Sequence, residues 1–234
     1  MTPKTKTQMP EYTWTAIQTQ RGEQHRYRDA KTGRYVSAAA VRGELDRFVD
    51  KAGRESARAL TEQLRDGKIA LPEWQTAMAR AVKNVNYAAV AAAAGGVENM
   101  TAVERGRAGG IIRGQYAYLR QFAADIESGK QPLDGRAVRR AEMYMQAGRG
   151  AFHAQKRAGA ADAMPGQRLM VRSHRHRGDS CRSCIELHGR WFAMGDPEYI
   201  PVGHRECNVS CRCDEELGTM DIDGIITGLG RSSF

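Results

Sequence analysis

Apolar residues recur at intervals of three and four through most of residues 37–163, the spacing that lines one side of an α-helix. The first series follows Ser37, a residue suited to cap a helix, and ends near Gly67. Its apolar positions are Val41, Leu45, Phe48, Val49, Ala52, Leu60 and Leu64. The pattern predicts one amphipathic helix over this segment.

Three further helices are predicted in the same way. Each begins at a first-turn or capping residue: Pro72, Thr101 together with Glu104, and Asp134. The first ends at the glycine pair 95–96, the second at Gly129, and the third runs through Phe152 and Ala154. The segment 37–163 is therefore expected to form an elongated bundle of about four helices.

Small residues interrupt these helices at three places. Gly109 and Gly110 each cost roughly 1 kcal/mol relative to alanine in a helix interior, so we expect a kink or a tight helix crossing there. Gly148 and Gly150, like the alanine-rich stretch 88–94, favour close packing of a neighbouring helix. Met143 and Met145 are interpreted as core residues.

The two ends of the chain have different patterns. Residues 1–24 combine two prolines with many polar residues and are expected to form an arm that orders against a partner or stays mobile. Tyr27 and Tyr35 flank a turn-forming segment, which predicts a short hairpin. Arg168–Arg172 is a strand candidate, and residues 219–234 are expected to be a weakly docked tail.

The sequence predicts a chain that works in a cytoplasm, or in something assembled there. The seven N-terminal residues have no apolar segment behind them, so no secretory signal is predicted. The longest uncharged stretch, 84–97, is too short to cross a bilayer, and no membrane contact is expected.

Charge is distributed unevenly along the chain. The net charge is +9, of which residues 1–36 carry +4 and residues 37–163 carry +6, whereas residues 164–217 are neutral and the tail carries −1. A basic surface of this size suits either contact with nucleic acid or a solvated helix surface.

All five cysteines lie within residues 181–213. A Cys-x2-Cys pair at Cys181 and Cys184 precedes Cys207, Cys211 and Cys213. Two thiolates on one tight turn and a second cluster about twenty residues on can complete the tetrahedral coordination that zinc prefers. We therefore predict one structural zinc held by four of these five cysteines, with His188 and His204 as alternates. A disulfide-linked module and packed reduced thiols remain alternatives.

These residues resemble the phage Mu F-like head-morphogenesis (minor head protein) family of tailed phages. The similarity runs from Arg140 and Glu142, through the helix with Gly148 and Phe152, to the Cys-x2-Cys pair and the closing Cys211-Arg212-Cys213. The upstream segment 27–36 and the helix with Tyr116 and Leu119 are also similar to small phage proteins that end in this module, so the resemblance covers about two thirds of the chain. Family members have an Arg-x-Glu helix, then Cys-x2-Cys, then an approach with proline and histidine, supplied here by Pro201 and His204.

The resemblance implies a non-enzymatic minor capsid protein in the virion head, which acts near the portal or in the capsid interior during assembly in the bacterial host cytoplasm. It implies the portal or major capsid protein as partners, packaged DNA as a further contact, and no small-molecule substrate. One departure concerns the histidine, which in many members lies two residues before Cys-Arg-Cys. Here Cys207 lies between His204 and Cys211, and the stronger binding of zinc by thiolate favours Cys207.

Three rival functions are weighed against this one. A zinc-ribbon nucleic-acid-binding protein is the main alternative, with Trp191 and Phe192 as the module's candidates for base stacking. A zinc-supported nuclease would use His174 or His176 as general base, but no convincing partner follows Cys184. ADP-ribosyl transfer, suggested by the Arg-x-Glu pair, lacks a nicotinamide-binding pattern, and an ion pair explains the pair more simply.

The sequence thus predicts a mainly α protein in four parts. An N-terminal arm and hairpin occupy residues 1–36, a helical domain 37–163, a cysteine-rich zinc-knuckle module 164–217, and a C-terminal tail 218–234.

Overall fold

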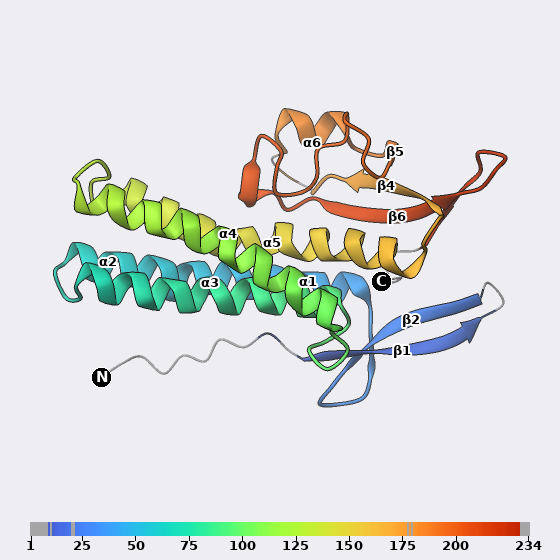
Figure 1. The fold of residues 1–234 in the computed structure, drawn as a ribbon, viewed down its shortest axis with the longest axis horizontal. Helices are drawn as coiled ribbons and strands as arrows, with labels where there is room; N and C mark the ends of the chain where they lie inside the picture. The colour runs from blue at the N-terminus through green and yellow to red at the C-terminus, as the bar shows by residue number, and fades with distance from the viewer. Residues whose placement is uncertain (1–8, 10, 20–21, 177, 179, 230–234) are drawn as a thin grey trace.

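The computed structural model describes residues 9, 11–19, 22–176, 178 and 180–229 of the chain. It is mainly helical, as the sequence predicts, and it also contains two small sheets. The long helices lie side by side, one sheet lies beyond an end of them, and the other covers the last long helix (Figure 1). Among the described residues, no helix is long and apolar enough to cross a membrane.

The first helical run begins as predicted but is not uniform. Helix α1 (Ala38–Ala52) continues into a π-helical segment, η1 (Gly53–Arg58), and then α2 (Ala59–Arg65). The hydroxyl of Ser37 accepts a hydrogen bond from the amide of Ala40 at 3.1 Å, which satisfies one unpaired amide of the first turn. The single predicted helix is thus three consecutive segments, because a π turn shifts the register after α1.

The next two helices match their predicted limits. Helix α3 (Leu71–Ala93) has Pro72 in its first turn, and α4 (Ala102–Glu127) opens on the expected capping box. The Glu104 amide donates to the Thr101 hydroxyl at 3.2 Å, and the Thr101 amide donates to the Glu104 carboxylate at 2.7 Å. Each side chain therefore satisfies a free amide of the other residue.

Helix α5 (Gly135–Ala163) is the longest element, and it contacts α1, α3 and the C-terminal region. A Cβ atom added at Gly148 would lie 2.7 Å from a methyl carbon of Val85, so the expected close packing there is confirmed. The expectation for Gly109 and Gly110 is wrong. A Cβ atom at either would meet nothing within 4 Å, and α4 continues through both, because that face of α4 has no described neighbour.

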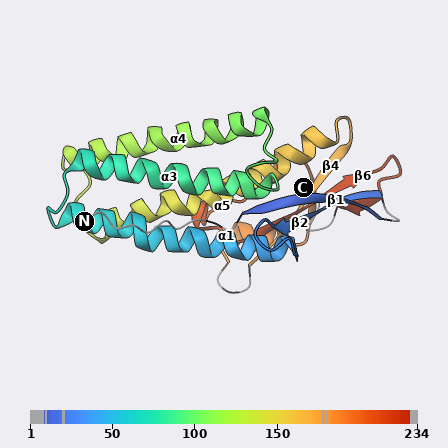
Figure 2. The ribbon, with the colours of Figure 1, turned by 90° about the horizontal axis from the view of Figure 1, so that it is seen from below.

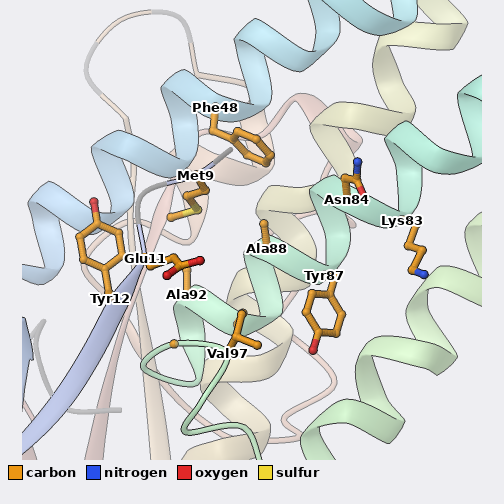
Figure 3. Close-up of a pocket in the computed structure, with 12 residues that line it drawn as sticks. Met9, Glu11, Tyr12, Phe48, Lys83, Asn84, Tyr87, Ala88, Ala92 and Val97 are labelled. Atoms are coloured by element: carbon orange, nitrogen blue, oxygen red, sulfur yellow. The ribbon is translucent and has the colours of Figure 1, made fainter. Parts of the chain in front are cut away.

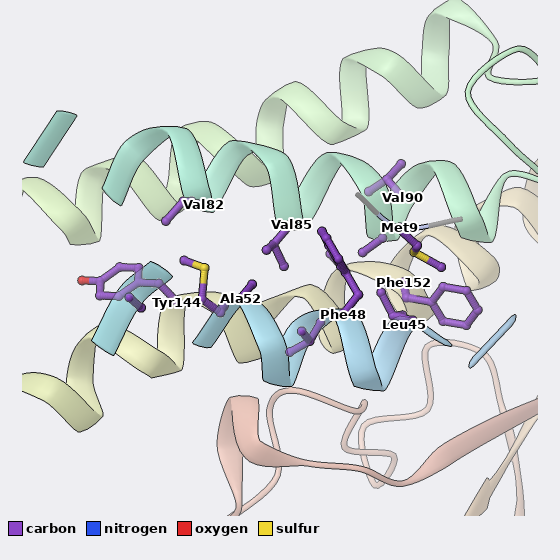
Figure 4. Packing of buried hydrophobic residues seen from close by; sticks show 14 of the residues in the cluster. Met9, Leu45, Phe48, Ala52, Val82, Val85, Val90, Tyr144 and Phe152 are labelled. Carbon is purple, nitrogen blue, oxygen red and sulfur yellow. The ribbon is translucent and has the colours of Figure 1, made fainter. Parts of the chain in front are cut away.

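Figure 4 shows part of the helical core, with Phe48, Tyr144 and Phe152 among its labelled residues, and aromatic rings join the helices of this core. Trp74 meets Phe122 edge-on at 5.2 Å between ring centres, and Phe122 stacks on Tyr144 at 6.0 Å. Met145 is fully buried and fills the core as predicted, whereas Met143 is 39% exposed. The two methionines differ because residues two apart on a helix face different directions.

The N-terminal sheet differs from the expected arm. Strand β1 (Tyr12–Thr19) pairs antiparallel with β2 (Gly22–Asp29), which pairs with the short β3 (Tyr35–Val36). The predicted turn between β2 and β3 is present, with the Asp29 carboxylate accepting bonds from two backbone amides. Residues 12–19 of the expected arm are thus a strand, whereas residues 1–8 lie outside the described residues.

The C-terminal region forms a four-stranded antiparallel sheet in the order β5-β4-β6-β7. Strand β4 (Arg168–His174) contains the predicted strand, and β5 (Trp191–Ala193), β6 (Asp214–Met220) and β7 (Ile226–Gly228) complete the sheet. The short helices α6 (Arg182–Glu186) and η2 (Asn208–Ser210) lie in the connections. Part of the expected tail is therefore paired as β7, although Ile222 is fully exposed.

Candidate metal centre

The five cysteines come from three short elements of the C-terminal region. Cys181 and Cys184 lie at the start of α6 and within it, Cys207 and Cys211 flank η2, and Cys213 directly precedes β6. One helical turn separates the first two cysteines, so both thiols reach the same side of α6. The fold thus brings together residues that are up to 32 positions apart in the sequence.

Cys184 is at the centre of the cluster. Its sulfur lies 3.6 Å from the sulfurs of both Cys207 and Cys211. Two groups of sulfurs lie within 4.8 Å of one another and share Cys184, one with Cys181 and Cys207 and the other with Cys211 and Cys213. All five cysteines are free thiols, and their sulfurs are farther apart than the roughly 2.05 Å of a disulfide. This cluster could hold a metal ion.

Neither alternate histidine belongs to these groups of described ligand atoms. His188 is exposed, and its Nδ1 accepts a bond from the Arg175 amide at 3.3 Å. His204 is also exposed and borders a groove between α4 and α5. His176, which the sequence offers only as a candidate general base, lines the small cavity of about 190 Å³ that the five cysteines surround.

The thiols of the cluster differ in their readiness to ionise. A hydrogen bond from Cys213, aided by the nearby Arg205 cation, lowers the pKa of Cys211 to about 5. Burial raises the pKa of Cys181, but hydrogen bonds with Ser183 and its neighbours outweigh this and lower it to about 7. Burial raises the pKa of Cys184. Thiolates are the metal-binding form of cysteine, so hydrogen bonds that favour ionisation of Cys211 and Cys181 also favour metal binding there.

Arg205 is a buried cation beside the sulfurs. Its NH1 group donates towards the Cys184 sulfur at 3.8 Å, and its Nε donates to the Ile200 carbonyl at 2.9 Å. Positive charge close to a thiolate offsets part of the cost of burying it. No spacing rule singles out this arginine, since its role depends on the folded loop.

A buried polar network connects this region to the helices. The carboxylate of Glu215, on β6, accepts bonds from the Tyr199 hydroxyl at 2.7 Å and the Val202 amide at 2.9 Å, and forms an ion pair with Arg157 of α5. His153 of α5 is completely buried between Glu215 and Arg42 of α1. These groups join α1, α5 and β6, and sequence analysis did not identify them.

The closing motif is bonded directly to the helices. Arg42 donates to the Cys213 carbonyl at 3.3 Å, and Arg212 donates to Asp50 of α1 at 2.8 Å. Asp50 also accepts from the buried Arg149 of α5 at 2.6 Å. The segment that carries Cys211 and Cys213 is therefore bonded to α1, and Asp50 connects it in turn to α5.

The residues on which the rival enzymatic hypotheses depend are bonded to other side chains. His174 lies 2.8 Å from the carboxylate of Glu216. Arg140 bonds Asp125 at 2.8 Å, and Glu142 bonds Arg58 at 2.9 Å. These contacts provide the simpler structural account of the histidine and the Arg-x-Glu pair.

A separate hollow of about 260 Å³ lies between the start of β1, α1 and α3 (Figure 3). Its floor is apolar, with Met9, Phe48 and Ala88, whereas Lys83 and Asn84 lie at its rim. The described residues that line this hollow include no cysteine or histidine. Among the described residues, the groups of side chains that could hold a metal ion consist of cysteines of the cluster.

A scan against protein-family models, a search of curated proteins and a search of solved structures each gave no match. The fold and the site by themselves place the chain in a broad class of protein. It is mainly helical, has two small sheets, and carries a cysteine cluster that could hold a metal ion.

Proposed function

We propose that the cluster is a structural zinc centre, in which four of the five cysteines supply thiolates. Zinc in structural sites is bound tetrahedrally by cysteine and histidine. The short distances around Cys184 and the five free thiols support this choice. The fifth cysteine is a spare thiol next to the centre.

We further propose that the chain is a non-enzymatic minor head protein of a tailed phage. The observation that carries this proposal is the bonding of Cys211-Arg212-Cys213 to α1, whose Asp50 also bonds Arg149 of α5, because this motif is the most specific part of the resemblance. A metal at this position would fix a loop surface against the helices, as a docking protein requires.

We propose no catalytic role because the cysteines are numerous enough to occupy every coordination position of a zinc ion. A catalytic zinc retains an open position for water, whereas five thiols are enough to fill all four positions. His174, the candidate general base of a nuclease, is hydrogen-bonded to the carboxylate of Glu216 at 2.8 Å. The chain would therefore act in the virion head, assembled in the bacterial host cytoplasm, with the portal or major capsid protein as partner.

The zinc-ribbon alternative has less support in the module. Phe192 is buried, and Arg172 covers one face of the half-buried Trp191 ring at 4.7 Å, so the module offers at most one ring face for base stacking. The helices suit nucleic acid better. Arg113 and Arg120 are exposed on α4 and form no ion pair with the described residues, and packaged DNA is a contact that they would fit.

The experiment compares head assembly with Cys184→Ser and with the exposed neighbour Ile185→Ala as control. We expect Cys184→Ser chains to be absent from purified heads, because loss of the metal unfolds the docking loop, and Ile185→Ala chains to be incorporated normally. Normal incorporation of Cys184→Ser would contradict the proposal. A folded His174→Ala chain that enters heads but blocks phage production would instead indicate an enzyme.

A further inference from the structure

Strand β1 has one paired edge and one open edge. Among the described residues it pairs with β2 alone, and β3 lies on the far side of β2. In an antiparallel pair, alternate residues direct their N–H and C=O groups towards the partner, and the others direct theirs to the opposite side. About half of the backbone polar groups of β1 therefore face away from β2. In Figure 2, seen from below, no other helix or strand covers β1.

The open edge is fixed in place at its first residue. The Tyr12 carbonyl approaches Gly96 so closely that a Cβ atom there would lie 1.7 Å from the Tyr12 oxygen. Tyr12 is also buried, against Tyr27. The turn between α3 and α4 thus positions the start of β1 and leaves the edge beyond it open.

The C-terminal sheet shows a contrasting design. Its seven-residue strands β4 and β6 are interior, and its edges are the three-residue strands β5 and β7. Short edge strands are one of the ways in which proteins limit pairing with other chains. The N-terminal sheet instead places an eight-residue strand at its edge.

Charge distinguishes β1 from every other long strand. Its sequence, Tyr12–Thr19, has no charged residue and no proline. Strand β2 carries Glu23 and Arg26 beyond the part covered by β3, and β4 and β6 also carry charges. Two copies of a chain with net charge +9 repel each other. Because β1 has no charged residue, two copies can pair along this strand without placing like charges opposite one another.

We propose that β1 pairs antiparallel with β1 of a second copy about a two-fold axis. The pairing joins two three-stranded sheets into one of six strands and satisfies the open backbone groups of both copies. A two-fold interface uses the same surface on both partners, which the uncharged strand permits. This dimer does not depend on the metal centre or on a role in phage heads.

Opposite charges placed on β1 test the pairing. Ala16→Lys and Ala16→Glu each bring like charges together across the seam, so each variant alone should dimerise more weakly, on the order of fivefold for each direct pair. An equal mixture of the two should recover the wild-type dimer. Gln24→Lys adds the same charge to β2 and is the matched control. Sedimentation equilibrium over a range of concentrations measures all four samples, and circular dichroism verifies that each is folded.

Hydrogen exchange gives a second readout. In wild-type protein, alternate amides of β1 should exchange more slowly as concentration rises, because the second strand pairs with them. A wild-type chain that stays monomeric up to millimolar concentration would overturn the proposal. So would a dimer that Ala16→Lys leaves intact, or a mixture of folded variants that does not recover it.

Discussion

Gly148 and Gly109 are both interior helix glycines, yet they face opposite surroundings. A methyl group at Gly148 would press on Val85, whereas one at Gly109 would point into open space. The first glycine is required by the approach of α3 to α5, and the second only weakens α4.

Alanine at these two positions should therefore act in opposite directions. Gly148→Ala should lower the free energy of unfolding by about 1–3 kcal/mol, because a packed core accommodates an added carbon poorly. Gly109→Ala should raise it by about 0.5–1 kcal/mol through helix propensity. Urea denaturation of both variants beside wild type measures the difference. Destabilisation by Gly109→Ala would contradict this account, because it would mean that another part of the protein packs against α4 at Gly109.

At the scale of elements, His153 links α5 to α1 and to β6. Burial, followed by the charges of Arg42, Lys156, Arg157 and Arg205, lowers the pKa of His153 well below its ordinary value. Glu215 and Asp214 lie 3.7 and 3.9 Å from the ring and act in the opposite sense. The lowering effects are the stronger ones, because complete burial opposes the charged form of His153 and four cations surround its ring.

This lowered pKa predicts a stability that falls with acid. Below about pH 6.5 the histidine of the unfolded chain binds a proton, whereas His153 in the fold does not, so acid favours unfolding. The loss should approach about 1.4 kcal/mol per pH unit below that value. His153→Gln should lack this part of the slope, while any loss of metal at low pH affects both chains. Equal slopes between pH 7 and 5 in urea denaturation would contradict the assignment.

The sequence predicts elements better than it predicts contacts between them. The helices could be found because caps such as Thr101 with Glu104 and the apolar spacing are local signals. Strand β1 was missed because its pairing with β2 is set by the folded hairpin and its composition resembles a polar arm. The cysteines could be identified by spacing, whereas Arg205 and His153 could not, since their positions depend on contacts over long sequence separations.

At the scale of the whole molecule, the basic charge lies on the helices and the N-terminal part rather than on the cysteine-rich module. If the chain contacts DNA, its affinity should fall steeply as salt rises, because each neutralised phosphate releases counterions. Replacing Arg113 and Arg120 by glutamine should reduce the slope of log affinity against log salt by about 1.8. Arg182→Gln, in the neutral module, is the control. Absence of DNA binding even at low salt would assign this surface to an acidic head protein.

The central claim is that the cysteine cluster is a metal centre on which the C-terminal fold depends. The most direct measurement is the metal content of the purified wild-type chain, beside a count of its reactive thiols before and after chelation. We predict about one zinc per chain, with four thiols protected until zinc is removed and the C-terminal region then open to protease. A metal-free chain whose C-terminal region resists protease as well as the native protein does, or five thiols that react at once, would contradict this account.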